Sequence, residues 1–397
     1  RIFHRLSPPA LLQADGSIAP LMMDVKWLDA ATAAPPAGWS RPDFDDRVWM
    51  RGPVRRSART PYLEQLCLRG KFMISDPAAV GELALEIEYF GGAVVRFNDR
   101  EIARGHWTAG ADLAQPYPLE AFLDGDGKLI EGLPSAPVAE LRRRTLKATV
   151  PREALRRGVN VLAIELRRAP YPVVLFDKKP RGVGGQSKDP GLMWNTCEIR
   201  TVSLTCSERR GLEPNFTRPE GLQVWNGSPF LSDVDVDYGD RTESLAPVEI
   251  VSPRNGALYG KLLVGRDRPL QGLAVSASDL KMGAVAIPSS AVSFLYAVAG
   301  GSEDVYANAE PQDRTVAPYR DGAGFLNMLV PAAPEEYPVA RRSSDPARRN
   351  GAVAPIWVRV RVPRDAGPGL YEGVLTIRLA DTAPVPVPLR VKVLPWT

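Results

Sequence analysis

Histidine and cysteine are scarce in this sequence of 397 residues. It contains only two histidines and three cysteines, and no two cysteines stand in a CxxC spacing. The sequence therefore has too few histidines and cysteines for a histidine-based triad, a zinc site or a disulfide framework. A single disulfide between two of the three cysteines remains an alternative. The motifs GxSxG, HExxH and GxxxxGKS/T are also absent, which disfavours zinc-dependent and nucleotide-dependent enzymes.

Long apolar runs are missing too. No stretch reaches the roughly 18 apolar residues that a membrane-spanning helix needs, so no membrane span is predicted. Lysine supplies only 10 of the 50 basic residues, and 46 acidic residues leave a net charge of +4. The arginine pairs are scattered and form no basic stripe, so we expect no nucleic-acid partner.

Glycine and proline are abundant, at 34 and 38 residues. Proline is poorly tolerated inside helices and central strands, so this composition predicts many turns and short elements. Apolar and polar residues alternate with period two in many segments, as is typical of strands with one buried face. Strands are predicted at 83–89, 93–97, 161–167, 197–205, 258–264, 273–278, 291–298, 357–362, 373–379 and 387–393. The predicted fold class is all-β, with two β-sandwich domains.

A domain boundary is predicted within residues 207–230. This stretch is rich in proline, glycine and charge, lacks sustained periodicity and has strands on both sides. The predicted domains are residues 1–212 and 213–397. The stretches 124–144, 176–192 and 300–352 show no strand pattern and are predicted as long loops.

Three segments of the first domain have distinctive patterns: WSRPDFDDRVW at 39–49, YFGGAVVRFNDRE at 89–101 and PREALRRGVNVLAIE at 151–165. They resemble the galactose-binding-like jelly roll found at the N-terminus of many large glycoside hydrolases, with Asp99 in place of a usual glycine. The resemblance covers about residues 1–207 and implies a fold more specifically than a ligand. The acidic residues Asp43, Asp45 and Asp46 are interpreted as fixing the loop that they occupy, with a metal role as the alternative.

The second domain contains PIWVRVRVPRDAGPGLYEG at 355–373. This segment is similar to an immunoglobulin-like sandwich that precedes a catalytic (β/α)8 barrel in bacterial glycoside hydrolases of the β-N-acetylgalactosaminidase type. In such proteins the last sandwich strand leads into the barrel, whereas this chain stops at Thr397. The resemblance implies the non-catalytic N-terminal region of a large glycoside hydrolase, whose downstream catalytic domain is absent from this chain.

Two clusters carry the residue types that sugar binding requires, an aromatic plane for the ring and polar groups for the hydroxyls. Arg104, His106 and Trp107 follow the hairpin at 93–102, and Trp194 and Asn195 end a glycine-rich loop. A glycan or polysaccharide is therefore the predicted partner. The alternative is that either tryptophan lies in a core or an interface. The remaining candidates, Trp225, Trp357 and Trp396, are interpreted as packing or domain-contact residues.

The most acidic segment contains Asp233, Asp235 and Asp237, separated by valines. In a strand, these carboxylates would share one face at about 6.5–7 Å spacing, where water, arginine or a cation must screen them. Calcium is the cofactor that such oxygens suit, and no other is predicted. The favoured interpretation is nevertheless a solvated strand or an edge strand guarded by charge, with a calcium site and a paired-carboxylate glycosidase site as the alternatives.

The leading hypothesis is an accessory, carbohydrate-binding region that positions a catalytic barrel, in a secreted, periplasmic or cell-surface protein of a bacterium. The alternative is a structural or adhesive cell-surface or assembly protein without glycan chemistry. A third hypothesis, that these residues are themselves a hydrolase, requires a cleft with two opposed carboxylates. The sequence identifies no catalytic residue, so whether the chain is an enzyme stays open.

Overall fold

The structure, a computed structural model, divides into two compact units, Arg1–Pro214 and Asn215–Thr397. It describes residues 1–21, 30–50, 62–128, 141–177, 196–215, 217–231, 233–299, 324–340 and 350–396. Strands dominate both units, and the predicted all-β class with β-sandwich domains is confirmed. Within the described residues, no helix is both long enough and apolar enough to cross a membrane.

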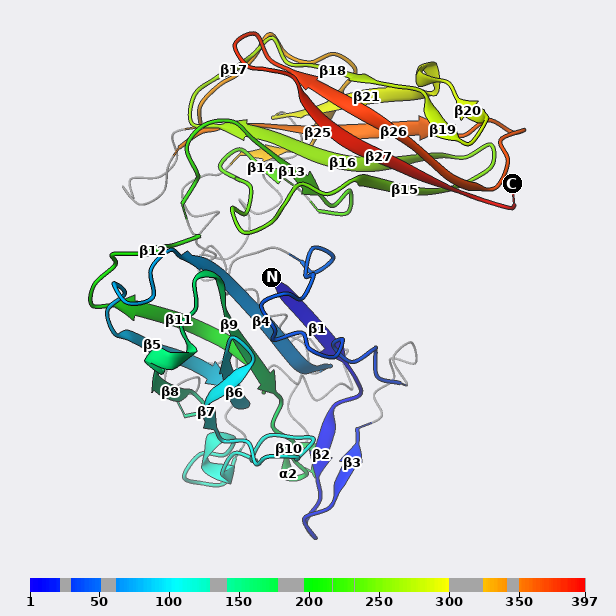
Figure 1. Ribbon diagram of the computed structural model, residues 1–397. Helices are drawn as coiled ribbons and strands as arrows, with labels where there is room; N and C mark the ends of the chain where they lie inside the picture. Colours follow the sequence, from blue (N-terminus) through cyan, green and yellow to red (C-terminus); the bar gives the residue numbers. More distant parts are fainter. Residues whose placement is uncertain are drawn as a thin grey trace. The chain divides into compact units, whose positions relative to one another are not determined.

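The first unit packs two antiparallel sheets face to face (Figure 1). The larger sheet has the order β1 (Ile2–Leu6), β4 (Leu63–Ile74), β9 (Gly158–Arg167), β6 (Gly92–Phe97) and β7 (Arg100–Gly105), and β12 (Leu212–Glu213) pairs with β4. The smaller sheet has the order β11 (Glu198–Cys206), β5 (Leu83–Phe90) and β8 (Arg144–Thr149). Beside them lie a sheet of β10 (Tyr171–Pro172), β2 (Ala10–Leu12) and β3 (Ile18–Pro20), and the short helix α2 (Val174–Asp177).

Strand β5 shows why the alternating pattern forms this core. Leu85, Ile87 and Tyr89 are almost fully buried, whereas Glu86, between them, is exposed. Burying each such apolar side chain contributes about 1.5–3 kcal/mol, so a register slip of one residue would exchange the buried and exposed faces.

The loop of residues 39–49 packs against the outer face of the larger sheet through its aromatic side chains. The ring of Trp49 lies 5.8 Å from that of Trp39, 5.5 Å from that of Phe44 and 5.1 Å from that of Phe3, measured between centroids. Trp39 and Trp49 are nearly buried. The two tryptophans of the sequence motif are therefore packing residues.

Asp46 fastens this loop to β4. Its carboxylate accepts hydrogen bonds from Arg69 Nε at 2.7 Å and Lys71 Nζ at 2.9 Å, and all three side chains are almost fully buried. Burial alone would raise the pKa of Asp46, but Lys71 and Arg69 hold it below its ordinary value. Arg69 also donates to the carbonyl oxygens of Trp39 and Arg41. The prediction that acidic residues fix this loop is confirmed for Asp46, whereas Asp43 and Asp45 form exposed ion pairs with Arg41 and Arg47 of the same loop.

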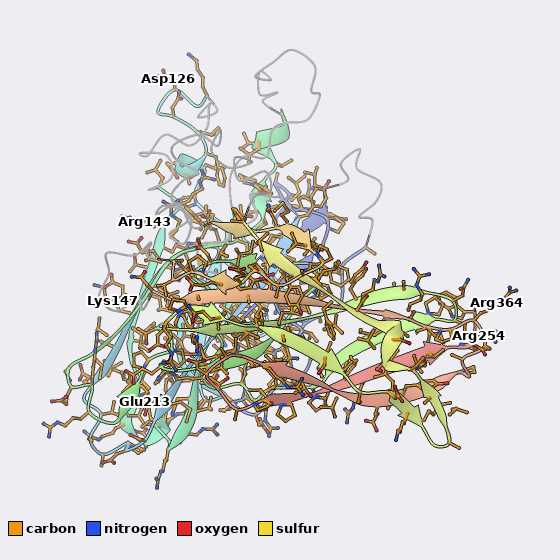
Figure 2. All side chains as sticks on the ribbon, turned by 90° about the horizontal axis from the view of Figure 1, so that it is seen from above. Asp126, Arg143, Lys147, Glu213, Arg254 and Arg364 are labelled. Carbon is orange, nitrogen blue, oxygen red and sulfur yellow. The ribbon has the colours of Figure 1, made fainter. Side chains whose placement is uncertain are left out.

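The second unit is also a sandwich of two sheets around one core. One sheet has the order β13 (Gln223–Gly227), β16 (Ala257–Arg266), β25 (Ala352–Arg361), β21 (Val292–Val298) and β23 (Met328–Val330). The other has the order β15 (Val248–Pro253), β27 (Val385–Leu394), β26 (Gly369–Arg378), β19 (Leu280–Met282) and β20 (Val285–Ile287), with β18 (Ala274–Ala277) paired to β26. Strand β15 runs parallel to β27. Figure 2 shows Arg254 and Arg364, in turns of this unit, pointing outward at one end.

Each predicted strand overlaps an observed one, but the prediction that 300–352 is all loop is wrong. Its last part contains β22 (Phe325–Leu326), β23 and β24 (Glu336–Tyr337), and β25 begins at Ala352. Strand β22 pairs with β14 (Asp233–Val234), and β24 pairs with β17 (Leu270–Gln271). Strands of two or three residues are too short to show a period. Most of 124–144 and 176–192 lies outside the described residues.

Candidate functional site

The predicted sugar-binding residues Arg104, His106 and Trp107 lie at the end of β7 and just after it. Trp107 is only 8% exposed, and its Nε1 donates to the carbonyl oxygen of Ala111 at 2.7 Å. The guanidinium carbons of Arg104 and Arg167 lie 5.5 and 5.4 Å from the centroid of its ring. Trp107 is therefore packed in the fold and presents no exposed aromatic plane, whereas glycan binding by this cluster stays a prediction.

The two polar residues of this cluster differ in what they offer a ligand. Arg104 donates through Nε and Nη2 to the two carboxylate oxygens of Glu101, at 2.9 and 2.6 Å. His106 is exposed, and its Nδ1 lies 3.0 Å from the hydroxyl of Tyr89. Burial and the nearby Arg144 lower the pKa of His106, so its ring is neutral at pH 7. A neutral imidazole with one nitrogen toward solvent can hydrogen-bond a sugar hydroxyl.

A glycine on β6 determines where this loop lies. A Cβ atom on Gly92 would come within 2.6 Å of Trp107 Cβ and 2.8 Å of Ala114 Cβ. Only a residue without a side chain lets the loop after β7 approach the sheet so closely. The position of Trp107 thus depends on Gly92.

The other predicted sugar-binding residues, Trp194 and Asn195, lie outside the described residues. The structure therefore gives no test of that pair.

A buried charge network on the outer face of the larger sheet was not predicted. Glu165 of β9 accepts hydrogen bonds from Gln65 Nε2 at 2.6 Å and Arg96 Nη1 at 2.9 Å, and Arg167 Nε lies 3.3 Å from it. Arg167 also donates to Glu64 at 3.2 Å. These contacts tie β9 to β4 on one side and to β6 on the other, so Glu165 serves the structure of the sheet. The period-two pattern of 161–167, which puts Glu165 and Arg167 on one face, was the available signal.

The aspartates at 233, 235 and 237 do not form the predicted common face. Strand β14 contains only Asp233 and Val234, because the chain turns directly after them. Asp235 Oδ1 accepts from the amide of Gly324 at 3.2 Å, and Asp237 Oδ1 accepts from the amide of Tyr238 at 2.9 Å. Among the residues that the structure describes, no three His, Cys, Asp or Glu side chains are grouped to hold a metal.

Asp233 instead forms a buried ion pair. Lys261 Nζ donates to both of its carboxylate oxygens at 2.9 Å and to the carbonyl oxygen of Leu231 at 2.6 Å. The side chains of Lys261 and Asp233 are 0% and 8% exposed. Burial raises the pKa of Asp233 to about 6, against the opposing attraction of Lys261. This pair holds the segment after β13 against β16.

Arg218, which was also not predicted, is buried in the second unit. It is 1% exposed, and its Nη2 donates to the carbonyl oxygen of Asp237 at 2.5 Å. Its Nε and Nη1 have no hydrogen-bond partner in the described part of the chain. The guanidinium occupies the space that side chains on Gly265 and Gly351 would fill. These glycines thereby admit a large cation to the interior.

The described residues also line surface hollows, one in each unit. One, of about 240 Å³, lies beside β13 and includes Trp225 and Asn226 in its lining. The side-chain amide of Asn226 exchanges two hydrogen bonds with the backbone of Ala246, so this group already serves the fold. The other, of about 360 Å³, lies on the outer face of the smaller sheet of the first unit, where Glu86 pairs with Lys147 at 3.2 Å. Its lining contains no aromatic side chain.

Comparisons with known proteins complete the description of the chain. No family model matches it, and no curated protein sequence matches it. Similar solved structures include a family 123 glycoside hydrolase from Clostridium perfringens, with 18% identity, 44% of this chain and 27% of that chain covered, and a TM-score of 0.28. A family 2 glycosyl hydrolase from Bacteroides cellulosilyticus has 10% identity, coverages of 90% and 34%, and a TM-score of 0.23. A β-glucuronidase from Bifidobacterium dentium has 9% identity, coverages of 99% and 47%, and a TM-score of 0.22.

The chain thus spans between about a quarter and a half of the length of these structures. All three are glycoside hydrolases by name, but TM-scores this low carry no argument about the present chain.

Proposed function

We propose that this chain is a non-catalytic accessory region of a multidomain glycoside hydrolase, with two β-sandwiches that position a catalytic barrel and contact a glycan. The proposal includes a secreted, periplasmic or cell-surface location in a bacterium. The galactose-binding-like and immunoglobulin-like types of the two sandwiches, and the β-N-acetylgalactosaminidase type of the parent protein, belong to the same proposal.

One observation carries it: the charged residues of the resembling motifs hold the scaffold together. Asp46 of the 39–49 motif binds Arg69 and Lys71, and Glu165 of the 151–165 motif binds Gln65 and Arg96. The segment at 355–373 supplies most of β25, between β16 and β21, and the start of β26. Residues with these tasks support a framework role, and catalytic carboxylates would then belong to another domain.

The coding sequence after the Thr397 codon distinguishes this proposal from the alternative of a structural or adhesive protein. We expect the reading frame to continue beyond the Thr397 codon for about 300 codons or more with alternating strand and helix patterns, the length of a typical barrel. The protein of the whole reading frame should then hydrolyse aryl glycosides, while residues 1–397 alone should not. A stop codon after Thr397, together with a concentration-dependent oligomer that binds no glycan, would support a structural or adhesive protein instead.

Glycan contact in the first unit has its own test. His106 and Arg104 are the polar groups at the predicted cluster, and Trp194 and Asn195 form the second predicted pair. We expect His106→Ala and Trp194→Ala to weaken binding on a glycan array of residues 1–397. Lys147→Ala, on the outer face of the smaller sheet, is the matched control. Unchanged binding in both variants would remove these residues from the proposal.

A further inference from the structure

One face of the second unit combines aromatic and basic side chains. It is the outer face of the sheet that contains β16, β25 and β21. We call it the Trp357 face; it comprises Tyr259, Lys261, Ser293, Leu295, Trp357 and Arg359. The strand register places Trp357 between Lys261 and Leu295, and Arg359 between Tyr259 and Ser293. The alternating residues Val358 and Val360 are fully buried in the core, so the Trp357 face points away from it.

Two aromatic rings form the apolar part of this face. The ring centroids of Tyr259 and Trp357 lie 5.9 Å apart, and the ring planes meet at 77°. Tyr259 is 37% exposed, and Trp357 is half-buried. Lys261 Nζ lies 5.4 Å from the centroid of the Trp357 ring. Because β25 is hydrogen-bonded on both sides, the tryptophan is presented on a rigid backbone.

The charged residues in the strands of this sheet are all basic. None of its five strands contains an Asp or Glu, whereas β16 and β25 contain Lys261, Arg266, Arg359 and Arg361. Lys261 and Arg266 are paired with Asp233 and Asp381. The side chains of Arg359 and Arg361 form no ion pair or hydrogen bond with any described residue, although their backbones belong to the β25 ladder. Among the described residues, therefore, no carboxylate neutralises these two guanidinium groups beside the aromatic pair.

We propose that the Trp357 face binds an acidic glycan, with a uronate ring packed on Trp357 and Tyr259 and its carboxylate paired with Arg359. The inference rests on the glycan contact of the proposed function and names its ligand class. An aromatic plane suits the apolar face of a pyranose, and the planar fork of a guanidinium matches a carboxylate. A uronate carries its carboxylate on the ring itself. Residues 357 and 359 project on one face about 7 Å apart, so stacking and charge pairing fit a single sugar.

The test measures calorimetric binding of residues 1–397 to three probes: tetragalacturonate, neutral maltotetraose and dextran sulfate. We expect tetragalacturonate to bind more tightly than maltotetraose, and its affinity to fall as salt is added. Arg359→Gln should weaken binding by about 10- to 100-fold, as expected for loss of a charge-assisted contact. Trp357→Ala should weaken it as well, and thermal unfolding checks that this variant is folded.

Arg390→Gln is the matched control, because Arg390 lies on the outer face of the opposite sheet and donates to Glu372 at 2.9 Å. This variant should bind like the unaltered chain. The proposal is overturned if Arg359→Gln binds tetragalacturonate as tightly as the unaltered chain, if maltotetraose binds equally well, or if no uronate binding is detected. The proposal is also overturned if dextran sulfate binds with the same affinity as tetragalacturonate and Trp357→Ala leaves that affinity unchanged. A surface that binds any polyanion would then explain the result. The reading-frame and aryl-glycoside tests of the proposed function can fail while uronate binding is observed, and the reverse, so the two failures are distinguishable.

Discussion

Replacing Lys261 by methionine tests the buried ion pair of the second unit. The substitution keeps a long apolar stem but removes the cation that lies 2.9 Å from both oxygens of Asp233. Since the two side chains are 0% and 8% exposed, the remaining carboxylate has little access to water. Breaking a buried pair in this way costs about 3–5 kcal/mol, a large part of the ~5–15 kcal/mol that stabilises a typical domain.

The loss should depend on pH in a defined direction. The pKa of Asp233 is about 6 in the folded protein and near 3.8 in the unfolded chain. A raised carboxyl pKa means that the folded state holds a proton which the unfolded state has released, so stability falls as pH rises from about 4 through 6. Without Lys261 the folded pKa rises further. The cost of Lys261→Met should therefore be about 3–5 kcal/mol at pH 8 and fall to about 1–3 kcal/mol at pH 5, where an uncharged buried group remains.

Urea unfolding of the full chain, read for each unit by hydrogen exchange of its peptides, measures these values. Lys281→Met is the matched control, because Lys281 is exposed on β19. The double variant Lys261→Met with Asp233→Val should regain most of the loss, since apolar replacements of a buried pair are often neutral. A loss equal to that of Lys281→Met at pH 8, or the same loss at pH 5 and 8, would refute this account.

Two further substitutions probe other parts of the scaffold. Asp46→Asn should destabilise the first unit by about 3–5 kcal/mol at pH 7, because it leaves Arg69 without its buried counter-charge. The pKa of Asp46 is lowered in the folded state, so the stabilisation is present above about pH 4 and is lost as pH falls below it. In urea unfolding, the difference in unfolding free energy between the unaltered chain and Asp46→Asn should therefore be smaller at pH 3 than at pH 7. Gly351→Ala should destabilise the second unit by about 1–3 kcal/mol, since its Cβ would overlap the guanidinium of Arg218. Gly70→Ala, where a Cβ meets nothing within 4 Å, is the control, and equal melting temperatures for the two alanine variants would contradict the packing argument.

The sequence predicted the strands of this protein well because one face of each long strand is buried. On β25, Val358 and Val360 alternate with Arg359 and Arg361, and this pattern alone identifies the strand. It also places Trp357 with the arginines, which was the available signal for the Trp357 face. Which aromatic residues stay accessible does not follow from such patterns, because neighbouring strands and loops determine it.

The surroundings of Trp107 and Asp233 could not be predicted from the neighbouring sequence. Trp107 follows a hairpin, where exposure is common, but its loop folds back and two arginines cover the ring. Asp233 begins an alternating acidic run, but the strand ends one residue later and Lys261 neutralises the first carboxylate. Arg167 and Lys261, which contact Trp107 and Asp233, are far from them in the sequence, and no local period encodes such contacts.

The place of β27 between β15 and β26 has a consequence for the order of events during synthesis. Val387, Leu389, Val391 and Val393 of this strand are fully or nearly fully buried, so the sheet stays divided until they are available. While Val385–Leu394 is still inside the ribosomal tunnel, β15 and β26 each present an unpaired edge. The first unit needs nothing beyond β12 for its strands and can close earlier. During synthesis the first unit can therefore fold while the second is still incomplete, and the second unit folds only after β27 has left the ribosome.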